Sequence, residues 1–156
     1  MKMTARFSCS ANPPMQQSPK VLLIDDNRHG LIARRTVLEE AGYQVETARD
    51  GKEGLEKFAA VHYDVVVTDF RMPHAGGAEV LKRVRQADRR VPVVLLSGYV
   101  RPLGLTEEST GADVVLSKGP TESQDLLRAI ARVLRKKKPG SQRGRSGRAK
   151  RAGSSG

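Results

Sequence analysis

The sequence has little of what disulfide-rich, secreted or membrane proteins depend on. It contains one cysteine, Cys9, and no tryptophan, and aromatic residues make up 4% of it. A single thiol can form neither an intramolecular disulfide nor a zinc site. No apolar run approaches the roughly 20 residues of a membrane span, and residues 1–20 lack the apolar segment of a secretory signal. These absences predict an ordinary hydrophobic core in a reducing cytoplasm, with a transit peptide as the alternative for the basic N-terminal segment.

Acidic residues are missing from both ends of the chain. The sequence carries 28 Lys and Arg against 17 Asp and Glu, a net charge of +11. Residues 1–20 and 135–156 hold no acid, so residues 21–134 carry 16 basic against 17 acidic side chains. We therefore predict a disordered extension over 1–19, one domain over 20–136 and a disordered basic tail over 137–156. For the tail, a solvated end and electrostatic docking on nucleic acid or anionic membrane are alternatives.

The domain segment alternates short apolar runs with stretches of helical periodicity. The predicted strands occupy 21–24, 43–48, 64–69, 91–96 and 113–117. Each is followed by a predicted helix, although proline and glycine make any helix between 99 and 112 short or frayed. Thr121 caps the last helix, which is predicted to end at Pro139-Gly140. Alternating strands and helices predict an α/β fold, a parallel sheet covered by helices on both faces.

Polar side chains end four of the five predicted strands. The first strand ends at Asp25-Asp26, the third at Asp69, the fourth at Ser97 and the fifth at Lys118. In such sheets the carboxyl ends of all strands share one edge, where ligands bind. Taken singly, the aspartates could be helix caps, the serine part of a turn and the lysine a surface residue. Four strand ends at one edge favour a single shared site.

The residue types at this edge favour phosphoryl chemistry. Three close carboxylates repel one another and therefore need a cation, and ligands that are all oxygen suit Mg²⁺. A carboxylate beside Mg²⁺ can attack a phosphoryl group and become an aspartyl-phosphate, because the metal offsets the developing charge. Lys118 would act as a point charge on the phosphoryl oxygens, and Ser97 would donate a hydrogen bond to them.

Four motifs carry a family resemblance: VLLIDDN at 21–27, VVTDFRMP at 66–73, VVLLSG at 93–98 and LSK at 116–118. Together they make residues 20–136 similar to the receiver domain of bacterial two-component response regulators. The resemblance implies a flavodoxin-like doubly wound sheet of five parallel strands in the order 2-1-3-4-5. It also implies a phosphoryl group taken from a histidine kinase or histidine phosphotransfer protein, and switched protein–protein contacts as the output.

The resemblance assigns a role to each site residue. Asp69 is the phosphoacceptor, Asp25 and Asp26 hold Mg²⁺ with it, and the Arg71 backbone carbonyl completes the protein ligands. Ser97 is the switch hydroxyl, and Lys118 is the lysine that senses the phosphate. Catalysis is limited to the domain's own phosphorylation and dephosphorylation.

The sequence departs from the family at two places. The usual Lys-Pro is here Lys118-Gly119-Pro120, and the aromatic residue expected three positions before the lysine is Val115. We therefore expect intact chemistry with an unusual output surface. About 22 residues follow Leu134, too few for a DNA-binding domain, which predicts a stand-alone receiver or a fragment of a longer protein.

Two other functions compete with a phosphorylated switch. One is a receiver-fold interaction module that is not phosphorylated and docks through its basic tail. The other is a metal-dependent phosphatase, which usually needs a second acid two residues beyond the nucleophile, where this sequence has Arg71.

Overall fold

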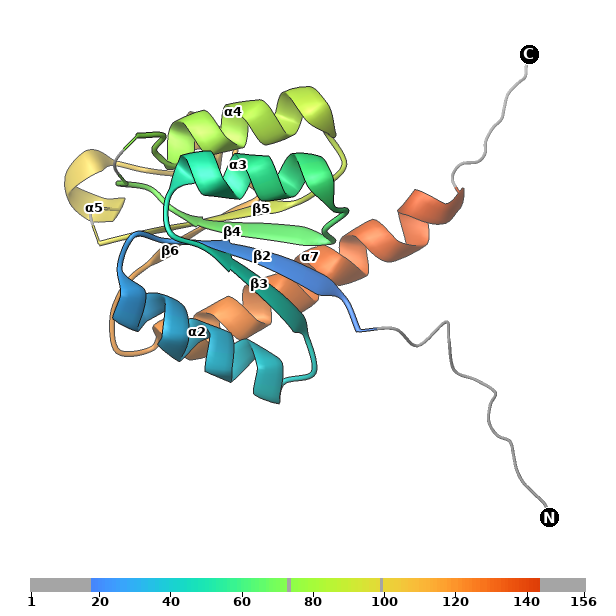
Figure 1. Cartoon of the computed structure of the whole chain (residues 1–156), viewed down its shortest axis with the longest axis horizontal. Coiled ribbons are helices and arrows are strands. Elements are labelled where there is room, and N and C mark those ends of the chain that lie inside the picture. Colours follow the sequence, from blue (N-terminus) through green and yellow to red (C-terminus); the bar gives the residue numbers. More distant parts are fainter. Residues whose placement is uncertain (1–17, 73, 99, 144–156) are drawn as a thin grey trace.

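The alternating sequence pattern folds into a parallel sheet between two layers of helices (Figure 1). The computed structural model describes residues 18–72, 74–98 and 100–143. The strands are β2 (Lys20–Ile24), β3 (Gln44–Ala48), β4 (Val65–Asp69), β5 (Val93–Ser97) and β6 (Val114–Ser117). The helices are α2 (Arg28–Glu40), α3 (Gly51–Ala60), α4 (Gly77–Ala87), α5 (Val100–Leu103), α6 (Glu107–Thr110) and α7 (Glu122–Arg143).

The order across the sheet is β3-β2-β4-β5-β6, with every neighbouring pair parallel. When the five strands are numbered by their order along the chain, this order is 2-1-3-4-5, which confirms the predicted doubly wound fold. All five residues of β4 and of β5 are buried, whereas β3 at the edge alternates between buried and exposed positions. Strands covered on both faces contain apolar residues throughout, which is why the sequence revealed them as continuous runs.

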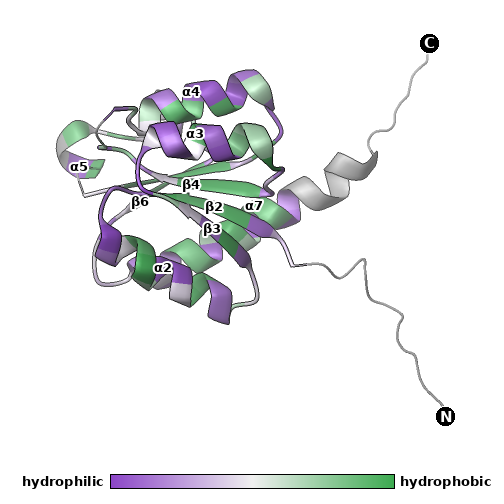
Figure 2. Cartoon of the chain, viewed as in Figure 1, coloured by the Kyte–Doolittle hydropathy of each residue, from purple (hydrophilic) through white to green (hydrophobic). Residues whose placement is uncertain are grey.

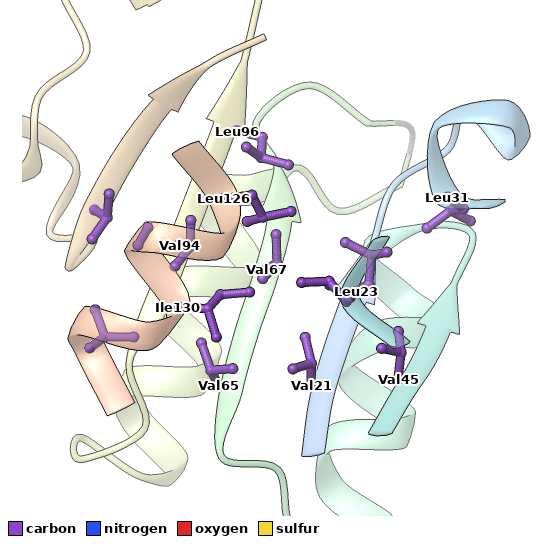
Figure 3. Packing of buried hydrophobic residues seen from close by; sticks show 14 residues of the cluster. Val21, Leu23, Leu31, Val45, Val65, Val67, Val94, Leu96, Leu126 and Ile130 are labelled. Atoms are coloured by element: carbon purple, nitrogen blue, oxygen red, sulfur yellow. The ribbon is translucent and has the colours of Figure 1, made fainter. Parts of the chain in front are cut away.

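Each face of the sheet has its own apolar core. Figure 1 shows α3 and α4 on one face and α2 and α7 on the other. In Figure 3, Leu126 and Ile130 of α7 point toward Val65, Val67 and Val94 of the central strands. Figure 2 shows the hydrophobic colouring concentrated in the strands, with hydrophilic residues on the helices around them. The sheet is therefore a rigid platform whose carboxyl edge presents the loops that carry the site.

Several helix ends carry residues that favour a helix terminus. The Asn27 side chain caps α2 by accepting from the Gly30 N–H, and Asp50 caps α3 by accepting from the Glu53 N–H. Gly42 follows α2 with φ of 102°, a conformation that a glycine adopts at low cost. The segment between 99 and 112 forms only α5 and α6, of four residues each, as its proline and glycine content predicted.

The last helix corrects one prediction. α7 continues to Arg143, beyond the predicted end at Pro139-Gly140. A proline removes one helical hydrogen bond, but the preceding lysines and arginine have high helix propensity and favour a helix C-terminus. The predicted tail therefore begins as helix, whereas residues 144–156 and the predicted extension up to residue 17 lie outside the described residues. Over 18–72, 74–98 and 100–143, no helix combines the length with the apolar character that crossing a bilayer requires.

Candidate functional site

Three aspartates meet at the carboxyl edge of the sheet. Asp25 and Asp26 follow β2, and Asp69 is the last residue of the neighbouring strand β4. One carboxylate oxygen from each lies within 4.8 Å of the other two. Asp25 and Asp69 are buried and Asp26 is exposed, so the cluster opens to solvent on one side. Three carboxylates at this spacing fit a hard divalent cation that keeps several waters, such as Mg²⁺.

The Asp69 carboxylate is held by a lysine from the end of β6. Lys118 Nζ lies 2.9 Å from Asp69 Oδ1 and 3.5 Å from Asp25 Oδ2. Burial raises the pKa of Asp69 above its ordinary value, Asp25 and Asp26 raise it further, and Lys118 opposes the shift. The site therefore holds a carboxylate whose negative charge is costly until a cation compensates it.

The Asp25 carboxylate has donors on both oxygens. Its Oδ1 accepts from the Asn27 backbone N–H at 2.9 Å. Its Oδ2 accepts from Arg34 Nη1 at 2.5 Å and also faces Lys118. The side chain is fully buried, so these contacts fix its orientation toward the other two aspartates.

Ser97 lies beside this cluster at the end of β5. The register pairs Asp69 with Leu96, which places Ser97 one residue farther along the neighbouring strand. Its side chain is buried, and its backbone carbonyl accepts from the Lys118 N–H at 3.0 Å. The predicted switch serine and the predicted phosphate-sensing lysine are therefore neighbours through the backbone, and the role of the hydroxyl stays a prediction.

The loop after Asp69 folds tightly back on the strand that carries it. The Gly77 N–H donates to the Phe70 carbonyl at 2.8 Å, and a Cβ on Gly77 would lie 2.6 Å from the Asp69 carbonyl. Only a residue without a side chain permits this approach, which explains the glycine at the start of α4. Arg71 is exposed in this loop, two residues beyond Asp69. The predicted part of its carbonyl in metal binding stays a prediction.

Arg34 and Glu122 contact the site although no sequence motif includes them. Arg34 Nε donates to Glu122 of α7 while its Nη1 binds Asp25, so the guanidinium lies between two carboxylates. No motif in the sequence marks Arg34, and its charge alone favours an exposed position. The available signal was Gly30, a poor helix former one turn before Arg34, which leaves room for the guanidinium.

Comparison with known proteins gives the site its context. The family model for the response regulator receiver domain matches residues 21–131. The transcriptional regulatory protein TrcR of Mycobacterium tuberculosis is 35% identical over 121 residues, which cover 75% of this chain and 46% of that protein. The gliding motility regulatory protein of Myxococcus xanthus is 33% identical over 131 residues, 77% of this chain and 16% of that protein. The chain spans about half or less of the length of these curated relatives.

Solved structures of single receiver domains match along almost their whole length. The chemotaxis protein CheY4 of Vibrio cholerae superposes with a TM-score of 0.68 at 34% identity, over 74% of this chain and 98% of that one. A receiver domain protein of Clostridium thermocellum gives a TM-score of 0.69 at 33% identity, over 77% and 97%. The fold, the acidic edge and these matches together place the chain in the response regulator receiver domain family.

Proposed function

We propose that this receiver domain takes a phosphoryl group onto Asp69 from a histidine kinase or histidine phosphotransfer protein and thereby switches its contacts with other proteins. The observation that supports the proposal most is the meeting of Asp25, Asp26 and Asp69 within 4.8 Å, with Lys118 bound to the phosphoacceptor. The response regulator TrrA of Thermotoga maritima, with a TM-score of 0.66 and 28% identity, was solved in complex with Mg(2+)-BeF.

The aspartate cluster fits a bound Mg²⁺, which Asp25, Asp26 and Asp69 would hold together with the Arg71 carbonyl. When bound, the ion offsets negative charge on the transferring phosphoryl group. Lys118 supplies the second positive charge and orients the Asp69 oxygen that it contacts. Ser97, at the end of the adjacent strand, would donate to a phosphoryl oxygen. The chain's own groups therefore align the nucleophile and compensate its charge.

The transfer exchanges one bond to phosphorus for another. An Asp69 carboxylate oxygen forms the new bond while the phosphorus–nitrogen bond of phosphohistidine breaks. The electron pair of that bond stays on the imidazole nitrogen, which takes a proton from solvent. In the reverse direction of the switch, water attacks phosphorus, Asp69 leaves as a carboxylate, and inorganic phosphate and a proton are released.

The phosphoryl group carries a charge of about −1.5 to −2, which replaces the single negative charge of the Asp69 carboxylate. Its oxygens compete for Lys118, which in the free domain contacts both Asp69 and Asp25. The backbone bond between the Lys118 N–H and the Ser97 carbonyl links the ends of β5 and β6, so both strand ends respond together. We propose that this rearrangement is the output, read by a protein partner in the cytoplasm.

The test is labelling with small phosphodonors. The purified chain is incubated with Mg²⁺ and acetyl phosphate or phosphoramidate, a donor with the phosphorus–nitrogen bond of phosphohistidine, and its intact mass is measured. We expect one labile phosphoryl group on the wild-type chain. It should not form when EDTA is present during the incubation, and it should not form on Asp69→Asn. Asp64→Asn is the matched control, because Asp64 directly precedes the opposite end of β4 and accepts from the Lys20 N–H. An unlabelled chain would favour the interaction module, equal labelling of Asp69→Asn would refute the site, and continuous release of phosphate at enzymatic rates would favour the phosphatase.

A further inference from the structure

A positive charge is buried in the apolar stripe of α2. The buried residues of this helix are Leu31, Arg34 and Leu38, spaced so that they share the face turned toward the sheet. The Arg34 side chain is 8% exposed. Burying a guanidinium is costly unless carboxylates compensate it, so the position needs a reason that an apolar side chain would not require.

The two carboxylates that compensate Arg34 come from different parts of the fold. One is Asp25, the predicted metal ligand, at 2.5 Å from Nη1. The other is Glu122, the first residue of α7, which accepts from Nε. Burial alone would lower the pKa of Arg34, and the contacts with Glu122 and Asp25 outweigh that effect and raise it. The guanidinium therefore stays charged and lies between the site and α7.

The helix makes room for this arrangement. A Cβ at Gly30 would lie 2.8 Å from Arg34 Nη1 and 3.4 Å from Cζ. Glycine favours a helix less than alanine does. An exposed arginine would move away from an alanine, but this one is fixed by two carboxylates. The glycine at position 30 therefore leaves space for the Arg34 guanidinium.

Charges of alternating sign run from α7 to the phosphoacceptor. In order they are Glu122, Arg34, Asp25, Lys118 and Asp69. Each contact in this series is short, and its middle member is a carboxylate that the cation would also have to bind. Two fixed cations, Arg34 and Lys118, therefore compete with a metal ion for Asp25. Within the described part of the chain, Arg34 is the one of the two that also has a carboxylate partner outside the aspartate cluster.

We propose that Arg34 is a positioning residue that competes with the metal ion for Asp25, and that Glu122 sets the strength of this competition. The inference rests on the proposed function only through the metal site. Removing the guanidinium should strengthen metal binding, because a cation next to a metal ligand lowers the local affinity for another cation. Removing the Glu122 charge should weaken metal binding, because the guanidinium then interacts with Asp25 alone.

The same coupling works in the opposite direction. Because linkage is reciprocal, a metal ion at the aspartates should shift the guanidinium toward Glu122 and so tighten the first turn of α7. Any partner that engages Glu122 would likewise change the affinity of the site for its cation. A partner protein that contacts the start of α7 could therefore respond to metal binding at the aspartates or change their affinity for the metal.

The experiment measures Mg²⁺ affinity of the full chain by isothermal titration calorimetry, at constant ionic strength and without a phosphodonor. Arg34→Met should lower the Kd roughly three- to tenfold and Glu122→Gln should raise it by roughly two- to fivefold, which are modest fractions of a full unit-charge interaction at this range. The double variant should match Arg34→Met, because Glu122 acts through Arg34. Arg34→Lys keeps the charge and should restore a Kd close to that of the wild type.

The outcomes separate this inference from the function it rests on. Wild-type chain that binds no Mg²⁺ would overturn both. If the wild type binds Mg²⁺ but Arg34→Met has an unchanged or higher Kd, only the competition is overturned. The same holds if Glu122→Gln changes the Kd by the same factor in the wild type and in Arg34→Met. Should Arg34→Met not fold, Gly30→Ala tests the same contact, because its methyl group pushes on the guanidinium. In the wild-type background we expect Gly30→Ala to lower the Kd for Mg²⁺, and an unchanged or higher Kd would overturn the proposal.

Discussion

The two edges of the sheet use carboxylates in opposite ways. At the amino edge, Asp64 accepts from the Lys20 N–H, and Asp113 accepts from the Val93 N–H and pairs with Arg85 at 2.7 Å. Each of these acids completes the hydrogen bonding of a neighbouring strand. At the carboxyl edge, the aspartates gather within 4.8 Å of one another instead.

This difference separates acids that serve the fold from acids that serve the site. A carboxylate that accepts from a backbone N–H lowers the free energy of the folded chain. Carboxylates that face one another raise it, and the raised pKa of Asp69, caused first by burial and then by Asp25 and Asp26, reports that cost. Repulsion that persists in a folded domain indicates a function that requires it.

The largest effect should come from the lysine that offsets this repulsion. Lys118→Met removes the cation 2.9 Å from Asp69 and 3.5 Å from Asp25. The transferring phosphoryl group then lacks one fixed positive charge. We expect the labelling rate to fall about 100-fold, as it does when one stabilising donor is removed from other active sites. Time-resolved labelling with acetyl phosphate measures it. Labelling at the wild-type rate would mean that the lysine serves only to pair the aspartates.

At the amino edge the corresponding change should reduce stability and leave the chemistry unchanged. Arg85 donates to the Val91 and Gly111 carbonyls and to Asp113, so Arg85→Met leaves three acceptors without this donor. We expect a loss of about 1–2 kcal/mol, or roughly 3–8 °C in Tm, with the labelling rate unchanged. Arg83→Met is the matched control, because Arg83 lies on the same helix and makes an exposed pair with Glu79. A lower labelling rate in Arg85→Met would contradict the conclusion that residues at the amino edge affect only stability.

The sequence alone could predict those features of the fold and of the site that depend on neighbouring residues. The strands were visible because doubly covered strands are continuous apolar runs, and the aspartate cluster followed because parallel strands end at one edge. The short helices α5 and α6 followed from local composition. Each of these conclusions needs only neighbouring residues and one rule about the sheet.

The parts that were missed depend on contacts between distant residues. Arg34 is buried because Glu122, 88 positions away, meets it across the fold. The residue type instead favours an exposed position, since charged side chains are rarely buried without partners. Ile32 on the same helix is apolar, yet it is 54% exposed. α7 continues past Pro139 although the local rule ended it there.

The repulsion at the carboxyl edge should appear as a pH dependence of stability in metal-free buffer. The native pKa of Asp69 lies above its ordinary value of 3.8, so the folded chain binds this proton more tightly than the unfolded chain does. Stability from this group therefore falls as pH rises above 3.8 through the native pKa. Asp69→Asn removes that titration.

We expect Asp69→Asn to have a Tm above that of the wild type by a few degrees at pH 7, since about 1 kcal/mol corresponds to roughly 3–6 °C in a domain of this size. The difference should shrink toward pH 4. Thermal unfolding in EDTA across this range checks it, and Asp64→Asn should not reproduce the pattern. A difference that grows on acidification would show that Asp69 is stabilised as a carboxylate.

The smallest effect tests a third acid of the fold-serving kind. Glu107 of α6 accepts from the Val115 N–H in β6 at 3.0 Å, and both groups lie near solvent. Because water can replace such an exposed bond, Glu107→Ala should cost less than about 1 kcal/mol and leave labelling unchanged. The Val115 amide should exchange its hydrogen faster, whereas Glu108→Ala on the same short helix should leave that amide as it is. If Glu107→Ala slowed labelling instead, a carboxylate bound to a strand N–H would be serving the site, and the division between the two edges would not hold.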